Sequence, residues 1–168
     1  MSDNMNDFAE ALTSKGKSSV IPDDKNYFGR FVGAWNFDGE YLNEKNETCT
    51  SKGEWVFSWV LEGKAVQDVF IWPPRSERDK PFTDNEYGTT LRFYNPETGN
   101  WDIIYSDNGT PVLLEAVKQG NNIVLTEKSE GKMQWIFSDI AENSFVWRSV
   151  YHENGGEKLL AKLDVYRA

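Results

Sequence analysis

Five polar side chains interrupt otherwise apolar stretches of this 168-residue chain and are its first candidates for chemistry. They are Gln67, Asp68, Arg92, Glu115 and Arg148. A buried charge is costly unless it is paired, so any of these that points inward needs a partner. An Arg–carboxylate pair could orient the anionic end of a ligand, and a buried Glu115 could transfer a proton.

A set of aromatic residues at odd-numbered positions is the second candidate. The chain has seven Trp, seven Tyr and ten Phe, which must mostly find apolar neighbours. If the rings face inward together, they could line a pocket for a hydrophobic, aromatic or planar guest. Alternatively, they fill the interior completely. The set is Trp35, Phe37, Tyr41, Trp55, Phe57, Trp59, Trp101, Tyr105, Trp135, Phe137, Phe145, Trp147 and Tyr151.

The alternation of side chains along a strand divides the five polar residues into two groups. Asp68, Arg92 and Arg148 have the parity opposite to the aromatic set, so we expect them on the surface, in cross-strand pairs. Gln67 and Glu115 share the parity of the aromatic set, so they are predicted to point inward unless a bulge reverses the assignment.

The chain has one histidine, His152, and one cysteine, Cys49. A late-strand histidine could hold haem inside a ring-lined barrel, so haem stays open as a cofactor. His152 has the parity of Arg148 and precedes the turn His-Glu-Asn-Gly-Gly, which favours an exposed position and a protein without a cofactor. This inventory cannot build a zinc site with nitrogen and sulfur ligands, and we predict no metal site and no catalytic residues.

Charge and termini limit the partners and the location. The formal net charge of −9 argues against nucleic acid and against an anionic membrane surface. The N-terminus has acidic residues where a signal peptide would be basic, and it lacks an apolar core, so we expect a cytoplasmic protein. A lone cysteine, which cannot form an intrachain disulfide, agrees with that location.

Strands with short turns account for most of the chain. Residues 55–72 are too often interrupted by charges to span a membrane, and their period of two with a Glu62-Gly63 turn predicts a β-hairpin. Helix is expected only near the start, at residues 7–15 and 23–32, with Asp23 or Asp24 as an N-cap. Ten strands are predicted, at residues 32–42, 48–61, 64–72, 87–94, 101–106, 112–119, 122–128, 132–140, 144–153 and 157–167.

The predicted fold is therefore all-β, an up-and-down antiparallel barrel of about ten strands with a short N-terminal helix. Closure removes the exposed edges of such a sheet, and a β-sandwich is the alternative. Residues 1–26 are expected to form a helical or flexible segment and residues 27–168 the barrel. The charged loop at residues 73–86 is a candidate flap at its mouth.

The tripeptide Gly33-Ala34-Trp35 at the head of the first strand resembles the G-x-W element with which lipocalins and related calycin barrels open. The segments EWVFSWVLEGKAVQDVFI, YGTTLRFYNPETGNW, WIFSDI and SFVWRSVY are similar to a group of uncharacterised bacterial lipocalin-like proteins, a similarity that covers residues 28–167. The resemblance implies a fold like that of lipocalins and fatty-acid-binding proteins, which takes up a small apolar ligand. It also implies that Trp35 plugs one end, with Arg167 across its indole face.

We expect non-enzymatic binding of a small hydrophobic or aromatic molecule inside the barrel. Three alternatives stay open: an enzyme that acts on a small apolar substrate by carboxylate acid/base chemistry, a haem-binding barrel, and a solid barrel that acts as an interaction module. The predicted ligand-binding residues are Trp59, Gln67, Trp101, Tyr105, Glu115, Trp135 and Trp147.

A homodimer is also predicted, because several apolar residues take the outward parity and would otherwise be exposed on the barrel wall. These are Val66, Phe70, Trp72, Tyr94, Ile104, Ile136, Val146 and Val150. The alternative is that the N-terminal helix covers them.

Overall fold

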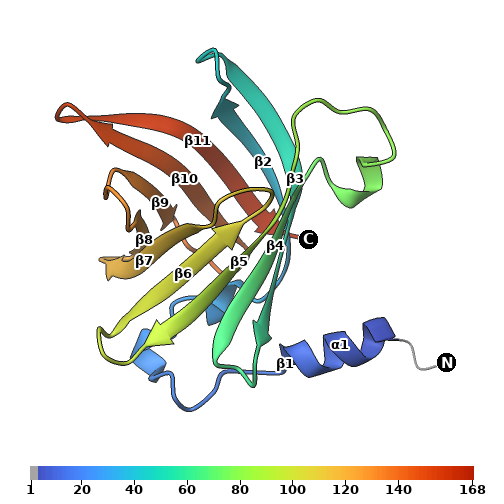
Figure 1. Ribbon diagram of the computed structural model, residues 1–168, viewed down its shortest axis with the longest axis vertical. Helices are drawn as coiled ribbons and strands as arrows, with labels where there is room; N and C mark the ends of the chain where they lie inside the picture. The colour runs from blue at the N-terminus through green and yellow to red at the C-terminus, as the bar shows by residue number, and fades with distance from the viewer. Residues whose placement is uncertain (1–3) are drawn as a thin grey trace.

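Ten antiparallel strands close into a barrel in the computed structural model, which describes residues 4–168 (Figure 1). The barrel strands are β2 (Gly33–Leu42), β3 (Thr48–Val60), β4 (Ala65–Trp72), β5 (Glu86–Asn95), β6 (Asn100–Ser106), β7 (Val112–Gln119), β8 (Asn122–Glu127), β9 (Met133–Ser138), β10 (Ser144–Glu153) and β11 (Gly156–Arg167). Each pairs with its neighbours in the sequence, and β11 pairs with β2 to close the ring. The predicted up-and-down barrel is confirmed.

The segment before the barrel is short and is attached to it. It contains the helix α1 (Asn4–Leu12), the outside strand β1 (Thr13–Ser14) and the 3-10 helices η1 (Asp23–Lys25) and η2 (Gly29–Phe31). Thr13 lies opposite Val60 of β3, and Ile21 is fully buried. The predicted N-cap is wrong, because Pro22 occupies the position before η1 and no side chain caps it. The first three residues of the predicted 1–26 segment lie outside the described residues.

The apolar stretch at residues 55–72 is the hairpin of β3 and β4, as predicted. Its turn places Leu61, Glu62 and Gly63 at positive φ, where only the glycine is free of strain from a side chain. Among residues 4–168, no helix has the length and apolar character needed to cross a membrane.

One end of the barrel is closed by Trp35 and the residues packed around it. The Arg167 guanidinium carbon lies 3.8 Å from the centroid of the Trp35 ring, and the indole N–H donates to the Phe31 carbonyl oxygen at 2.7 Å. Arg167 also donates to the carbonyl oxygens of Val32 and Arg30, at 2.8 and 2.9 Å. At Gly33, φ is +124°, and a Cβ would lie 2.7 Å from Arg167 Nη1. Glycine is therefore required at the first position of Gly33-Ala34-Trp35.

The inward parity changes along the barrel, and this corrects several predictions. Odd-numbered residues face inward on β3, but Trp55 lies opposite Phe70, so even-numbered residues face inward on β4. The same reversal occurs where Trp101 lies opposite Ala116 and where that alanine lies opposite Leu125. Paired residues lie on the same face of the sheet, so where an odd-numbered residue pairs with an even-numbered one, the parity that faces inward changes from one strand to the next.

Asp68 and Arg92 are therefore inside the barrel and buried, at 0% and 1% exposure, where the sequence predicted a surface position. Gln67 and Glu115, predicted to point inward, lie on the outer face instead. Gln67 donates to the Thr89 hydroxyl at 2.9 Å, and Glu115 lies between the buried Leu114 and Ala116. Arg148 lies opposite Ile136 and Lys162 and keeps its predicted outward parity.

The apolar outer surface is smaller than predicted, because the parity that faces inward changes between strands. Val66 belongs to the core, and Phe70, Trp72 and Tyr94 pack against it. Ile104, Ile136, Val146 and Val150 keep the outward parity, although Val150 is only 1% exposed. Helix α1 projects from the barrel beside the β3–β4 hairpin and does not cover this wall (Figure 1). The homodimer stays a prediction.

We expect the Arg167→Ala variant to lower the free energy of unfolding by about 1–3 kcal/mol, because it removes a cation–π contact and several hydrogen bonds to backbone carbonyls. Arg167→Lys keeps the charge without the planar donors and should lie between that variant and the wild type. Urea unfolding monitored by circular dichroism measures both. An unchanged stability of Arg167→Ala would contradict the role given to this residue.

Candidate functional site

The barrel interior contains a cavity of about 200 Å³. It lies toward the end where β2 and β4 finish, opposite the end closed by Trp35. Its wall is mainly aromatic, and some neighbouring rings meet edge to face, as Tyr105 and Trp135 do at a centroid distance of 5.3 Å. The rings that line the cavity are Tyr41, Trp55, Phe70, Trp72, Tyr105, Trp135, Phe137 and Trp147.

A buried ion pair lies at the deep side of this cavity. Arg92 Nη2 is 2.6 Å from Asp68 Oδ2, and the two side chains are 2% and 0% exposed. The other carboxylate oxygen of Asp68 accepts the backbone N–H of Thr90 at 3.1 Å. The guanidinium carbon of Arg92 also lies 5.1 Å from the ring centroid of Phe28 and 5.2 Å from that of Phe57. The pair therefore has the close partners that a buried charge requires.

Two polar side chains of the cavity wall retain unused donors. Within residues 4–168, the buried Nε and Nη1 of Arg92 and Nε1 of Trp55 have no hydrogen-bond partner. Buried donors in folded proteins are nearly always satisfied, so three donor nitrogens without partners on residues of one cavity are an exception that calls for an explanation.

Glu86 is the acidic residue at the rim of the cavity. Its carboxyl group accepts hydrogen bonds from the Tyr105 hydroxyl and from Trp72 Nε1, the latter at 3.1 Å. Burial raises the pKa of Glu86 to about 7, and the nearby charges of Asp107 and Asp68 act in the same direction. The hydrogen bond from Trp72 opposes this shift. A carboxyl group with such a pKa can accept or donate a proton near neutral pH.

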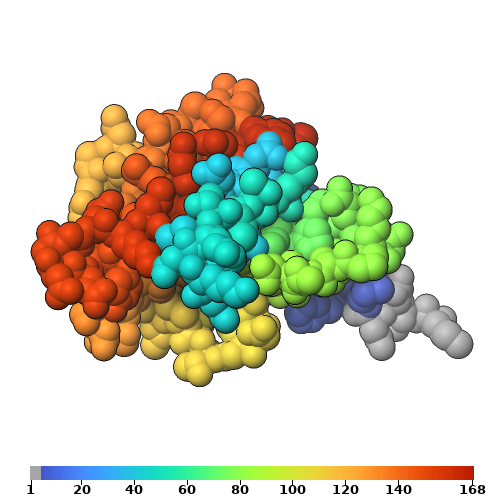
Figure 2. Space-filling view, turned by 90° about the horizontal axis from the view of Figure 1, so that it is seen from above, coloured from blue at the N-terminus to red at the C-terminus, as the bar shows by residue number. Residues whose placement is uncertain are grey.

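Beside the cavity, the barrel wall has a gap in its strand pairing, and an outer groove of about 830 Å³ lies next to it. Residues 48–53 of β3 pair with β2 on one side, but strand β4 pairs with β3 only from Glu54 onward, so on the other side these residues have no strand partner. Figure 2 shows this loop, in green, beside the β2–β3 hairpin, in cyan. Tyr41, Ser51 and Trp72 line both the cavity and the groove, so they separate the two.

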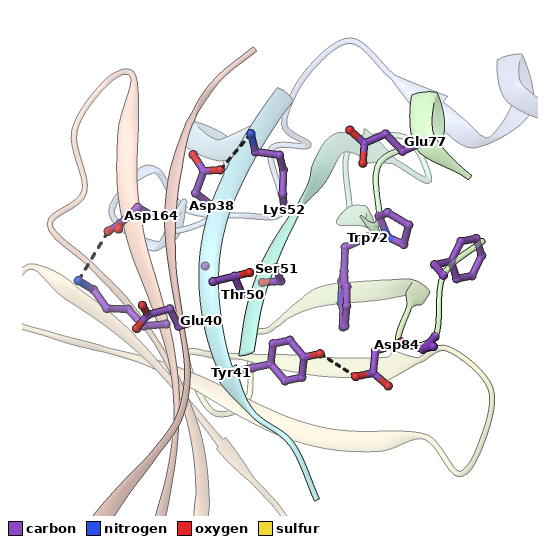
Figure 3. Close-up of a pocket in the computed structure, with 15 residues that line it drawn as sticks. Asp38, Glu40, Tyr41, Thr50, Ser51, Lys52, Trp72, Glu77, Asp84 and Asp164 are labelled. Atoms are coloured by element: carbon purple, nitrogen blue, oxygen red, sulfur yellow. Dashed lines mark hydrogen bonds and ion pairs between the residues drawn. The ribbon is translucent and has the colours of Figure 1, made fainter. Parts of the chain in front are cut away.

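Tyr41 and Trp72 fill much of this gap (Figure 3). Their ring centroids are 5.2 Å apart, and the Tyr41 hydroxyl donates to Asp84 Oδ2 at 2.8 Å. Burial, followed by the hydrogen bond to Asp84, raises the pKa of Tyr41 above its ordinary value, so the phenol stays protonated and keeps this bond. The loop is thus tied to the barrel through a side chain that also lines the cavity.

The groove outside the gap is polar and open to solvent. Asp38 pairs with Lys52 at 3.6 Å, and Asp164 pairs with Lys162 at 3.7 Å, as Figure 3 shows. No group of three or more His, Cys, Asp or Glu side chains in the described part of the chain could hold a metal ion. The cavity is less open than the groove and can bury more of a small guest, so it is the better candidate site.

The structure brings only some of the predicted ligand-binding residues together. Tyr105, Trp135 and Trp147 line the cavity. Trp59 and Trp101 pack in the core, and Trp101 Nε1 donates to the Lys25 carbonyl oxygen at 2.8 Å. Neither of these two tryptophans lines the cavity.

Two other predicted residues, Gln67 and Glu115, lie on the outer face, as described above. His152 does not line the cavity either, and its Nε2 lies 2.8 Å from Gln134 Oε1. Sequence reasoning missed Glu86, which was placed in a flexible loop, and assigned Arg92 to the surface. The position of a charged residue inside an apolar strand was the sequence feature that could have indicated a buried Arg92.

Compared with known families and with curated proteins, the chain matches no family model and no curated sequence. Function is therefore inferred from the geometry of the cavity.

We expect the stability of the Glu86→Gln variant, relative to wild type, to rise by about 1–3 kcal/mol between pH 4.5 and pH 8. Because the pKa of Glu86 is raised to about 7 in the folded chain, its stabilising contribution is complete below about pH 4.5 and is lost as the pH rises through 7. Urea unfolding at several pH values measures the difference.

Glu127→Gln is the control for this experiment. Hydrogen bonds from the Ser129 side chain and from backbone N–H groups lower the pKa of Glu127 to about 2, so its contribution is lost only as the pH falls below about 4.5. The difference between Glu127→Gln and wild type should therefore stay nearly constant from pH 5.5 to 8. A similarly constant difference for Glu86→Gln would show that burial does not perturb that group.

Proposed function

We propose that this chain is a lipocalin-like binding protein that takes up a small apolar, ring-containing molecule inside its barrel. The observation that carries the proposal is the ring-lined cavity of about 200 Å³ in an otherwise packed interior. Close packing is the rule in protein interiors, so a cavity of this size beside buried Trp and Phe side chains favours a binding site.

The size of the cavity limits the guest. Pockets for drug-sized ligands measure about 300–1,000 Å³, and this one is smaller. A molecule of one or two rings would fit without movement of the wall, whereas a porphyrin or a long acyl chain would need the wall to move. Together with the position of His152 outside the cavity lining, the size favours a guest other than haem.

The lipocalin-like assignment is supported by the closed end of the barrel. The packing of Arg167 on Trp35 is the contact expected of a G-x-W element at the head of a calycin barrel, and the positive φ of Gly33 explains why glycine precedes it. A binding role fits this architecture, although a shared fold alone does not determine function.

Entry of the guest is proposed at the gap between β3 and the loop at residues 73–85. Tyr41 and Trp72 would have to move aside, and the hydrogen bond from Tyr41 to Asp84 would open with them. The bond is exposed, so breaking it costs little. The predicted position of the mouth at residues 73–86 is kept in this proposal.

Titration with ethylbenzene and indole, followed by saturation-transfer NMR, tests the proposal. Ala161 lines the cavity, so Ala161→Leu should fill part of it and weaken the binding of both compounds at least about tenfold. Ala34→Leu is the matched control, because Ala34 is exposed on the outer face of β2 and the same change there should leave the affinity unaltered.

Failure of both compounds to bind the wild-type chain would contradict the proposal. Equal binding by Ala161→Leu and wild type would contradict it as well, because the guest would then lie elsewhere.

A further inference from the structure

The unused hydrogen-bond donors of Arg92 and Trp55 indicate that the guest carries a hydrogen-bond acceptor. The Arg92 side chain is 2% exposed and Trp55 is 4% exposed, so neither can turn its N–H groups toward bulk water. A buried donor without a partner is unfavourable, and an acceptor atom on a guest removes that cost. A guest that presented only hydrocarbon to these N–H groups would leave them without partners, so the free-energy penalty would remain.

Arg92 and Trp55 both pack against the ring of Phe57. The Phe57 ring lies 5.0 Å from the Trp55 ring and 5.2 Å from the Arg92 guanidinium carbon, centroid distances in each case. Both residues line the same cavity of about 200 Å³. A guest in this cavity can therefore contact both residues that carry the unused donors.

The positive charge of Arg92 is already balanced. Asp68 Oδ2 lies 2.6 Å from Arg92 Nη2, so the pair has no net formal charge. A carboxylate guest would bring an uncompensated negative charge into a buried site, toward Asp68 and on the same cavity wall as Glu86. The chain as a whole, at −9, adds no attraction for an anion.

We infer that the guest presents an uncharged hydrogen-bond acceptor, such as a ketone, aldehyde or amide oxygen, to the N–H groups of Arg92 and Trp55. This inference rests on the proposed function, since it names the chemical class of the molecule that the cavity takes. The ring of the guest lies against the aromatic wall, and its oxygen lies at the deep end, beside the ion pair.

Three probes of similar shape test the inference with the full chain at pH 7.5: acetophenone, ethylbenzene and benzoate. All three contain a benzene ring, and its substituent carries a ketone oxygen in acetophenone, only hydrocarbon in ethylbenzene and a carboxylate in benzoate. We expect acetophenone to bind at least about tenfold more tightly than either of the others in calorimetric or NMR titrations.

Trp55→Phe keeps a ring but removes one donor, so it should lower the ratio of acetophenone to ethylbenzene affinity about threefold or more. Trp147→Phe is the matched control, because Trp147 lines the same cavity and its indole N–H is not among the buried donors without a partner. That change should alter both affinities by a common factor and leave the ratio unchanged. Circular dichroism establishes that both variants fold.

The outcomes separate the inference from the function on which it rests. Tightest binding of benzoate would overturn the uncharged acceptor, and equal binding of ethylbenzene and acetophenone would overturn recognition of any acceptor. Either result leaves cavity binding intact. If none of the three probes binds, the proposed function fails and the inference fails with it.

Discussion

Closure of the sheet is the constraint on which the rest of the structure depends. Once β11 pairs with β2, every second side chain must enter one enclosed volume, and its size is set by the strands and not by the side chains. Phe28, Phe31 and Trp35 fill the end near the short 3-10 helices, whereas the cavity lies toward the other end. The cavity is therefore a consequence of filling a barrel from one side.

The Arg92–Asp68 pair gives this cavity a polar, uncharged end. Each charge satisfies the other, yet the planar guanidinium offers more donors than one carboxylate can accept, and Arg92 keeps two nitrogens without partners. At the rim, Glu86 is held by Tyr105 and Trp72, two side chains of the same wall. The interior thus combines aromatic walls with polar groups at two depths, an arrangement suited to orienting a guest as well as enclosing it.

The sequence predicted the strands and their order well, because a period of two and the turn residues are local signals. It could not predict which face turns inward on every strand. That assignment depends on whether odd residues pair with odd or even ones in each hairpin, as in the pairing of Trp55 with Phe70. For this reason Gln67 and Glu115 were placed inside and Arg92 outside. The role of Glu86 at the rim of the cavity was not predicted, because this residue begins a strand directly after a charged loop. Only the folded chain brings its carboxyl group to the Tyr105 hydroxyl.

The central claim is that the barrel interior is open and apolar enough to admit a guest. Diffraction from crystals pressurised with xenon tests it most directly, because xenon enters dry apolar cavities without a specific polar contact. We expect a xenon peak inside the cavity that Trp55, Phe70 and Trp147 help to line. The absence of any xenon peak within this cavity would contradict the claim.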